Sequence, residues 1–393
     1  MIPHLLERCD EAVLSAEGLL AAAKDSVGRI AGQDKDEQSQ RAVHALAWYA
    51  TYVEALRQMA RWARGLSEAG RFGQIEQLIV LMVFGEYLAQ LAGGIAMSQS
   101  EIARPYNLGL SNQDIGGFWT PTVNELAVAG TAAPTREGIA KYLRANSGAI
   151  AFGDPGLDDT MGMVREHFFR FAREKVAPFA HQWHLKDELI PLSVIGEMSA
   201  LGVFGLTVPE NYGGSGLSKI AMCVVSEELS RGYIGVGSLG TRSEIAAELI
   251  LSGGTREQRE YWLPKIAGGE ILPTAVFTEP DTGSDLGALT TRAVREGDLY
   301  KIHGNKTWIT HAARADLMTI LVRTDPNTKD YRGLSMYLAE KPRGSDAGPF
   351  PATGMTGSEI KVLGYRGMRE YELGFSGFAV PAANLLGGQE GQG

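Results

Sequence analysis

The first hundred residues show the apolar spacing of long amphipathic helices. Between residues 40 and 66, apolar positions recur at intervals of three and four, which is the period of one helix face. These positions are Leu46, Tyr49, Val53, Leu56, Ala60 and Ala63. Ala69-Gly70 ends this helix, and a second one is predicted over residues 73–93, so that the two form a helical hairpin. We interpret the Met and aromatic residues here as core packing rather than as a cofactor site.

The longest apolar run, residues 78–84, lies between Glu76 and Glu86. It is much shorter than the roughly 18 apolar residues that a membrane-spanning helix needs. The run therefore predicts a buried helix and no membrane span.

Residues 103–150 lack a long periodic pattern. Pro105, Pro121 and Pro134 interrupt them, and a short helical pattern appears only at residues 136–146. We interpret this segment as a linker or a strap lying on another domain. Residues 1–150 are thus predicted to be a helical N-terminal extension and linker.

A helical pattern returns at Asp158. A stripe of apolar residues recurs at helical spacing: Met161, Val164, Phe168, Phe171 and Val176. Further helices are predicted at residues 191–201, 219–230, 243–251 and 255–267, the last with Thr255 as its N-cap. The loop at residues 207–216 contains Gly-Gly-Ser-Gly, either a phosphate cradle or a substrate-cavity loop. We favour the substrate loop, because no strand precedes it and it lacks a P-loop lysine.

From Ile271 onward the pattern changes to short strands separated by Gly, Pro and Asp turns. The clearest candidates are residues 316–322, 334–338, 360–363 and 371–378. This pattern favours a small antiparallel barrel or sandwich over residues 271–386.

The residues richest in chemistry lie at 276–310, in two parts separated by a predicted hairpin. The first, Thr278 to Asp285, combines a proline that fixes φ, a glycine that permits close approach, and hydroxyl side chains. The second alternates like a half-buried strand, turns at Gly304-Asn305, and ends in Thr307-Trp308-Ile309-Thr310. Either part alone has an ordinary structural interpretation, a turn or a core tryptophan. Together they indicate a surface for a flat, polar ring system.

Composition narrows the class of protein. The net charge of −9 gives no footprint for nucleic acid. The two cysteines, Cys9 and Cys223, form neither a disulfide framework nor a structural zinc site by themselves, and they fit a reducing cytoplasm. The N-terminal sequence MIPHLLERCDEAVL lacks the pattern of a secretory signal. We expect a cytoplasmic protein without a metal site.

The two motifs T-E-P-x-x-G-S-D and G-N-K-x-W-I-T, in this order, resemble the middle domain of the flavin-dependent acyl-CoA dehydrogenases. The stretches P-E-x-Y-G-G-x-G at residues 209–216 and Q-R-x-Y-W-L-P-K-I-A-x-G-E at residues 258–270 are similar to that family as well. The resemblance covers residues 157–393. It implies an α+β multidomain fold with a helical N-terminal domain at 151–270 and an antiparallel β-barrel middle domain at 271–386. Residues 387–393 match a linker to a C-terminal four-helix bundle, which is absent from this sequence.

The resemblance implies that FAD is the cofactor and assigns roles to matching residues. Thr278 gives its N–H and hydroxyl to the flavin's pyrimidine side, with Phe277 and Gly283 beside it. Trp308, Ile309 and Thr310 pack along the ring, with the Thr310 hydroxyl near the nitrogen that receives hydride. Ser284 touches both cofactor and the CoA end of the substrate. Phe277 departs from the family, which more often has a smaller aliphatic residue there.

The implied reaction is α,β-dehydrogenation of an acyl-CoA, with electrons passed to an electron-transferring flavoprotein by a homodimer or homotetramer. The family places its glutamate base in the C-terminal domain, so the resemblance implies no catalytic base within residues 1–393, and Glu279 is expected to be structural. Residues 348–357, residues 360–378 and the N-terminal extension resemble a branch that oxidises (2S)-methylsuccinyl-CoA to mesaconyl-CoA.

That substrate carries a free carboxylate, which needs a fixed cation. Arg242 is the candidate, and the alternative is a surface ion pair of Arg242 with Glu244 or Glu248. His311 either contacts the flavin or a partner subunit, or caps a turn, and we favour the cap. Two other functions stay open: a dehydrogenase of an ordinary branched short-chain acyl-CoA, and a flavin-binding relative without dehydrogenase activity.

Overall fold

The computed structural model describes residues 2–31, 37–149 and 151–392. The chain divides into two compact units, Met1–Leu157 and Asp158–Gly393. Each unit has its own apolar core.

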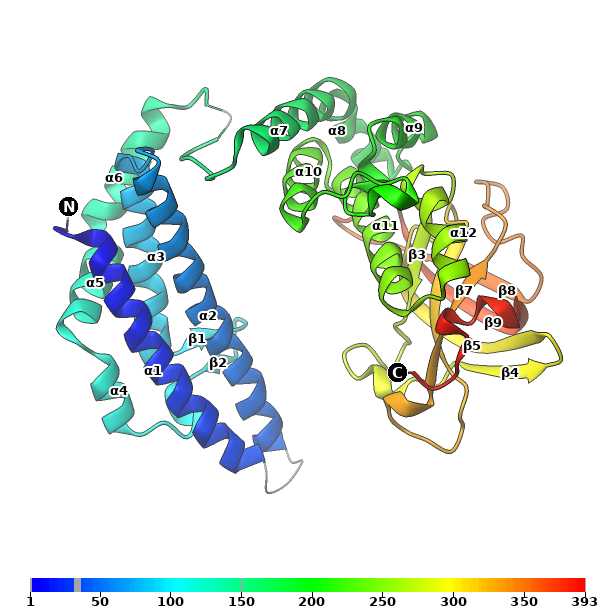
Figure 1. The fold of residues 1–393 in the computed structure, drawn as a ribbon, viewed down its shortest axis with the longest axis horizontal. Coiled ribbons are helices and arrows are strands. Elements are labelled where there is room, and N and C mark those ends of the chain that lie inside the picture. Colours follow the sequence, from blue (N-terminus) through cyan, green and yellow to red (C-terminus); the bar gives the residue numbers. More distant parts are fainter. Residues whose placement is uncertain (1, 32–36, 150, 393) are drawn as a thin grey trace. The chain divides into compact units, whose positions relative to one another are not determined.

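The first unit is a bundle of helices. Its long helices are α1 (Leu5–Ala31), α2 (Glu37–Glu68) and α3 (Gln74–Gly93), which run side by side in Figure 1. Shorter elements follow: β1 (Ile95–Ala96), β2 (Ile102–Ala103), α4 (Asn112–Phe118), α5 (Pro121–Thr131) and α6 (Ala133–Ala145). The helices predicted over 40–66 and 73–93 are therefore confirmed as α2 and α3.

Helix α3 is long and apolar enough to cross a membrane by length and composition alone. Val80, Phe84, Leu88 and Leu91 are nevertheless buried in the core of the first unit, where α3 packs against α2 and α5. The apolar run is thus a core helix, as its flanking glutamates indicated.

The prediction of an irregular linker at residues 103–150 is wrong, because the described residues of this segment form the helices α4, α5 and α6. Ser111 and Thr120 cap α4 and α5, and each side chain accepts a backbone N–H. Pro121 occupies the first turn of α5, where its fixed φ suits a helix start and its missing N–H costs nothing. The prolines that suggested irregular chain are helix starts.

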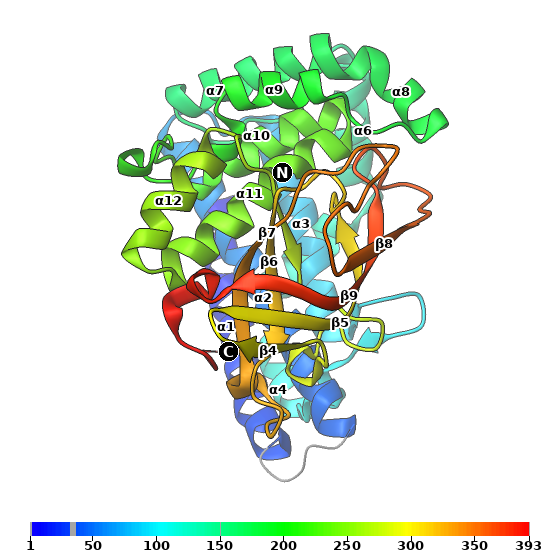
Figure 2. The ribbon, with the colours of Figure 1, turned by 90° about the vertical axis from the view of Figure 1, so that its right-hand side faces the viewer.

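The second unit begins with helices that lie on one side of a sheet (Figures 1 and 2). They are α7 (Asp159–Phe171), α8 (Ala177–Lys186), α9 (Leu192–Ala200), α10 (Lys219–Gly232), α11 (Ile234–Gly253) and α12 (Arg256–Ala267). Helix α11 starts at Ile234 and not at Ser243 as predicted. Its early glycines allow close packing on α10, since a Cβ at Gly237 would lie 2.0 Å from Ser230 Oγ.

The strands of the second unit form a seven-stranded sheet in the described residues. They are β3 (Pro273–Val276), β4 (Arg292–Glu296), β5 (Leu299–Thr310), β6 (Leu317–Arg323), β7 (Leu334–Glu340), β8 (Met355–Ile360) and β9 (Glu370–Pro381). The order is β3-β6-β4-β5-β9-β8, with β7 also on β6. Because β6 pairs in parallel with both β3 and β4, the sheet is mixed, and the prediction of an antiparallel barrel is wrong in that respect.

Two local predictions need correction. The strand expected at residues 360–363 lies earlier, at β8, and Leu363 is exposed in a loop. The turn expected at Gly304-Asn305 is instead the interior of β5, where Gly304 has a φ of +142°. A Cβ at Gly304 would lie 2.7 Å from Thr291 Cα, so glycine permits close strand packing rather than a turn. The predicted hairpin is formed by β4 and β5.

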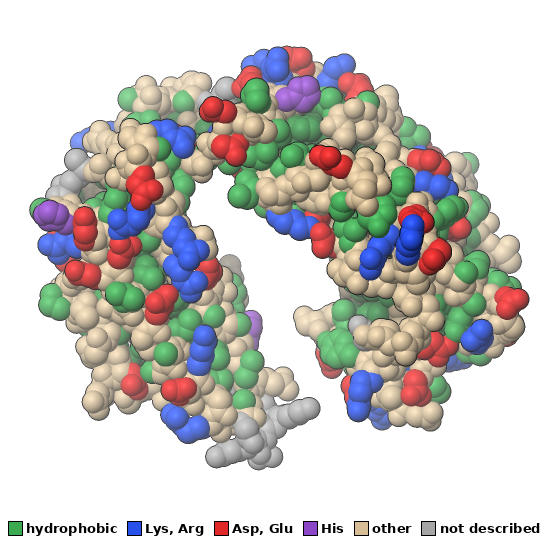
Figure 3. Space-filling model, viewed as in Figure 1, with side chains coloured by type: hydrophobic (Ala, Val, Ile, Leu, Met, Phe, Trp, Pro, Cys, Tyr) green, Lys and Arg blue, Asp and Glu red, His purple; other side chains and the backbone are tan. Residues whose placement is uncertain are grey.

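Charged side chains of both signs are interspersed over each unit in the view of Figure 3. In this view, the described residues of each unit taken by itself show no continuous basic surface of the kind that nucleic-acid binding requires.

Candidate functional site

The two motif segments meet at the end of β3. The backbone N–H of Thr307 donates to the Thr278 carbonyl oxygen at 2.9 Å. One residue earlier on β5, the Lys306 ammonium donates to the Phe277 carbonyl oxygen at 2.7 Å. Segments that are 29 residues apart in sequence are thus held side by side.

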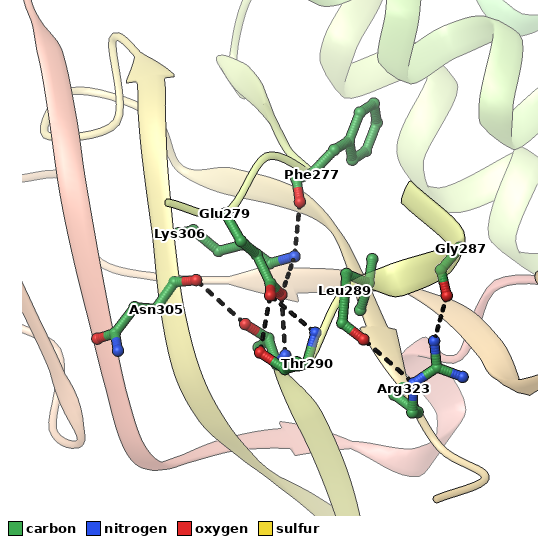
Figure 4. Close-up of polar contacts among 9 residues, drawn as sticks. Phe277, Glu279, Gly287, Leu289, Thr290, Asn305, Lys306 and Arg323 are labelled. Carbon is green, nitrogen blue, oxygen red and sulfur yellow. Dashed lines mark hydrogen bonds and ion pairs between the residues drawn. The ribbon is translucent and has the colours of Figure 1, made fainter. Parts of the chain in front are cut away.

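Glu279 and Lys306 form the buried clamp that joins these segments (Figure 4). The Glu279 carboxylate accepts hydrogen bonds from Thr290 N (2.7 Å), Thr290 Oγ1 (2.9 Å) and Thr291 N (2.8 Å). Lys306 Nζ lies 3.1 Å from Glu279 Oε1. Burial alone would raise the pKa of Glu279, but these donors and the ammonium outweigh it and lower the pKa to about 2. Glu279 is therefore an ionised, fully engaged acceptor, which suits a structural residue and not a general base.

The turn after Thr278 is closed by reciprocal backbone hydrogen bonds. Glu279 N donates to Thr282 O at 2.8 Å, and Thr282 N donates to Glu279 O at 3.1 Å. Beyond it, Arg323 fixes the chain by donating to the carbonyl oxygens of Gly287 and Leu289 (Figure 4). The turn is rigid because both of its sides are held.

This rigid turn presents polar groups that make no hydrogen bond to any other described residue. Neither the Thr278 hydroxyl nor its N–H has a hydrogen-bond partner among the described residues, and Ser284 is exposed. Beside Gly283 there is open space, since a Cβ there would meet only Thr278 Cγ2, at 4.0 Å. Free donors next to open space can bind the acceptor edge of a flat ring.

Trp308 lies at a β-bulge in β5. The register with β9 shifts between Lys306 and Ile309, and Trp308 has a φ of +59°. The bulge turns the indole outward, 56% exposed, while the next residue, Ile309, is buried. A non-glycine residue at positive φ is strained, and such strain clusters at functional sites. His311, directly after β5, and Arg369, directly before β9, share this positive φ (+64° and +65°). The backbone N–H of His311 donates to the Arg369 carbonyl oxygen.

Thr310 is held on both sides. Its carbonyl oxygen accepts a hydrogen bond from Thr274 Oγ1 at 2.7 Å. Its hydroxyl lies 2.8 Å from Oε1 and 3.0 Å from Oε2 of Glu370, the first residue of β9. Sequence reasoning missed Glu370, because strand alternation gives no sign of a buried carboxylate there: Glu370 and Tyr371 are both buried.

Arg242 projects from α11 and has hydroxyl partners instead of a carboxylate. Its Nη2 donates to Tyr365 Oη at 2.9 Å and to Ser238 Oγ at 3.2 Å. Its Nε is buried without a partner among the described residues. The alternative ion pair with Glu244 or Glu248 is not formed, since both carboxylates bind Lys219. Tyr365 was missed, because it lies 123 residues away in sequence.

His311 is 2% exposed, and neither ring nitrogen has a partner among the described residues. Burial and, to a lesser extent, nearby cations, Arg314 first, together lower the pKa of His311 to about 3. The imidazole is therefore neutral. The turn after it is capped by the His311 backbone oxygen, which accepts from Arg314 N and Ala315 N, and not by the side chain as favoured from sequence.

In the loop at residues 207–216, the Gly-Gly-Ser-Gly run has no backbone amide free for a phosphate. The N–H groups of residues 213–216 all donate to backbone carbonyl oxygens, such as Gly216 N to Val208 O at 2.9 Å. At Gly214 a Cβ would lie 2.0 Å from Val208 O, so this glycine serves the loop's own packing. The phosphate-cradle interpretation is wrong.

Comparison with known proteins agrees with these features. Residues 158–270 match the N-terminal domain of acyl-CoA dehydrogenase, and residues 274–378 match its middle domain. The chain is 57% identical over 400 residues to (2S)-methylsuccinyl-CoA dehydrogenase of Cereibacter sphaeroides, covering all of this chain and 72% of that protein.

Two solved structures are similar to the second unit's sequence and fold. One is the glutaryl-CoA complex of glutaryl-coenzyme A dehydrogenase, with a TM-score of 0.55, 32% identity, and 61% and 59% of the two chains covered. The other comes from work on the electron transferring flavoprotein of Acidaminococcus fermentans, with a TM-score of 0.55, 30% identity, and 61% and 60% covered. The chain thus spans about three fifths of each of these proteins. The chain is similar to the Cereibacter protein over all of its own residues, and it matches two domains of one family. The chain therefore belongs to the acyl-CoA dehydrogenase family.

Proposed function

We propose that the protein catalyses FAD-dependent α,β-dehydrogenation of a short, branched acyl-CoA, (2S)-methylsuccinyl-CoA, to mesaconyl-CoA. The observation that carries this proposal is the 57% identity, over the whole of this chain, with a protein of that name. The site residues described above supply its chemical support.

The residues around Thr278 and Trp308 fit a flavin. Thr278 offers a free N–H and a free hydroxyl to the ring's pyrimidine edge, and Gly283 leaves room for it. Trp308 offers an exposed aromatic face. Phe277 and Ile309 are proposed as further ring contacts from the family resemblance. Thr310 lies toward the nitrogen that accepts hydride. When bound, the flavin supplies the two-electron acceptor for the hydride leaving Cβ.

Arg242 is proposed to bind the substrate's free carboxylate. Its guanidinium is oriented by the hydroxyls of Tyr365 and Ser238, which are uncharged hydrogen-bond partners. A half-buried cation whose hydrogen-bond partners are neutral can gain from an incoming carboxylate, and a guanidinium binds a carboxylate with paired hydrogen bonds. Ser284, exposed on the turn, is proposed to contact the CoA end.

The remaining machinery is proposed from the family resemblance. The base is a glutamate of the family's C-terminal domain, FAD is shared between subunits of a homodimer or homotetramer, and the electron acceptor is an electron-transferring flavoprotein. A similar solved structure from work on such a flavoprotein supports the last assignment.

The test compares substrates on the purified full-length protein loaded with FAD. We expect turnover of methylsuccinyl-CoA to exceed that of butyryl-CoA and isobutyryl-CoA. A chain that retains no yellow flavin, or that turns over butyryl-CoA best, would contradict the function or the substrate, respectively.

Arg242→Met isolates the carboxylate contact. We expect kcat/KM for methylsuccinyl-CoA to fall by about a hundredfold, as for loss of a buried charge-assisted pair, with little change for butyryl-CoA. Lys219→Met is the matched control, because it removes a cation already paired with Glu244 and Glu248. Equal losses on both substrates, or an unchanged KM for methylsuccinyl-CoA, would remove Arg242 from this role.

A further inference from the structure

Glu370 is a buried carboxylate beside the candidate site that the proposed function does not use. It is 5% exposed and lies directly opposite Thr310 in the antiparallel pairing of β5 with β9. Such opposite residues are held close by the backbone ladder itself. The contact between their side chains is therefore fixed by the fold.

The geometry sets the direction of the hydrogen bond between them. A threonine hydroxyl has one hydrogen to donate and can accept on its oxygen. Thr310 Oγ1 lies 2.8 Å and 3.0 Å from the two Glu370 oxygens, so its hydrogen points between two acceptors. The Thr310 oxygen then has only acceptor capacity left for any other partner.

The Thr310 hydroxyl and the Arg242 guanidinium favour the acceptor form of Glu370 against the effect of burial. Among the described residues, the Thr310 hydroxyl is the only group within hydrogen-bond distance of its carboxylate. Burial raises the pKa of Glu370 above its usual value, whereas the Thr310 hydroxyl and the Arg242 guanidinium oppose that rise. The same arginine that is proposed to bind substrate thus favours the ionised form of Glu370.

We propose that Glu370 is a positioning residue that makes Thr310 a hydrogen-bond acceptor toward the flavin, and so favours the reduced flavin. This rests on the proposed function, which places Thr310 beside the nitrogen that accepts hydride. That nitrogen only accepts hydrogen bonds in oxidised flavin and carries an N–H in reduced flavin. An acceptor-only threonine matches the reduced form and opposes the lone pair of the oxidised form.

Glu370 also acts through its charge, and that effect has the opposite sign. A negative charge near the ring disfavours the anionic reduced flavin. The two effects must be separated by variants that remove them one at a time. Glu370→Gln removes the charge and keeps an acceptor oxygen for Thr310, whereas Glu370→Met removes both.

The experiment is a redox titration of the bound flavin in the full-length protein loaded with FAD. We expect Glu370→Gln to retain a higher potential than Glu370→Met, equivalent to about a tenfold larger ratio of reduced to oxidised flavin at the same applied potential. In a Thr310→Val background this difference disappears, because no hydroxyl remains to be oriented.

Two outcomes overturn the inference while the proposed function stands: equal potentials for the two Glu370 variants, or an undiminished difference between them when both also carry Thr310→Val. Wild-type protein that binds no flavin would remove the proposed function and this inference together. Thermal unfolding of every variant shows that the folded protein was measured. If Glu370→Met does not fold, Glu370→Leu takes its place in both comparisons, because it too removes the charge and the acceptor oxygen.

Discussion

At the scale of single residues, the site combines strain with buried charge. Trp308 adopts a left-handed backbone conformation that costs an L-residue about 1–2 kcal/mol. The surrounding strands hold it there through the ladder between β5 and β9. This strained conformation exposes the indole at the surface, one residue after the Thr307 amide that donates to Thr278 O.

We therefore expect Trp308→Gly to be more stable than Trp308→Ala in the flavin-free protein, by about 1 kcal/mol. Glycine adopts positive φ without strain, whereas alanine retains the cost, so the usual order of these residues in a strand is reversed. Denaturant unfolding measures the difference, and both variants are expected to lose flavin on gel filtration.

The matched pair for this prediction is Lys301→Gly and Lys301→Ala, in the same strand at ordinary φ. There alanine is expected to be the more stable, since glycine costs more entropy. An alanine variant at least as stable as the glycine variant at Trp308 would contradict the strain argument.

The clamp at Glu279 makes stability depend on pH. Its folded pKa of about 2 lies below its ordinary value of 4.5. The folded state thus binds the proton less tightly than the unfolded state, so this stabilisation is present above about pH 4.5 and is lost as pH falls toward 2. At most it amounts to roughly 3 kcal/mol.

We expect the stability advantage of wild type over Glu279→Gln to shrink between pH 6 and pH 3, as measured by urea unfolding at each pH. The same replacement at Glu296, which is exposed, controls for a lost surface charge. Parallel curves for wild type and Glu279→Gln across this range would show that the ionised clamp contributes nothing specific.

At the scale of elements, glycines set how closely helices approach in the first unit. Helix α3 crosses α5 where Gly85 meets Gly130. A Cβ at Gly130 would lie 2.1 Å from Leu81 O and 2.6 Å from Gly85 Cα, both of them backbone atoms that do not move aside easily. We expect Gly130→Ala to lower the unfolding free energy by about 2 kcal/mol or more.

Gly65, in α2, is the matched control for that change. A Cβ there meets nothing within 4 Å, and the residue is exposed. Gly65→Ala is expected to stabilise the protein by about 0.5–1 kcal/mol, because alanine is the better helix former. If both alanine variants change stability in the same direction, close packing at Gly130 is not the cause.

Sequence periodicity predicted the elements whose apolar face repeats over several turns. Helices α2 and α3 are examples, since their stripes are uninterrupted. It failed where residues with weak helix propensity are helical for tertiary reasons, as in the glycine-rich start of α11. It also failed to give the parallel pairing of β6, because partner choice between strands leaves no periodic signal in either one.

The candidate site, like the fold, was predicted from the sequence only in part. The turn at Thr278 and the strand end at Trp308 were predicted from their own residues, and the structure brings them together. Tyr365 and Glu370, which orient Arg242 and Thr310, were not predicted. Each acts across strands or between a helix and a loop, so only the folded arrangement shows the contact.

At the scale of the whole molecule, the two units have separate cores. Residues from α1, α2, α3, α4 and α5 form one apolar cluster, and none of its members comes from the second unit. A segment of about 150 residues with its own core is large enough to fold by itself. We expect residues 1–157 alone to give a helical circular dichroism spectrum and a cooperative thermal transition.

The end of this unit can be tested more sharply, because residues beyond 150 are bound to its helices. Asp154 N donates to Glu76 Oε1 at 2.8 Å, and Asp154 O accepts from Trp62 Nε1 at 3.0 Å. The Asp154 carboxylate also pairs with Arg71 at 3.0 Å.

A chain ending at residue 150 leaves the buried Glu76 carboxylate without one of its donors, so we expect it to be less stable than 1–157 by about 1–3 kcal/mol. Urea unfolding of both chains measures this, with Arg71→Ala in 1–157 as the control for the exposed ion pair, which is worth at most about 1 kcal/mol. Equal midpoints for the two chains would mean that residues 151–157 add nothing to the first unit and that its boundary lies before them.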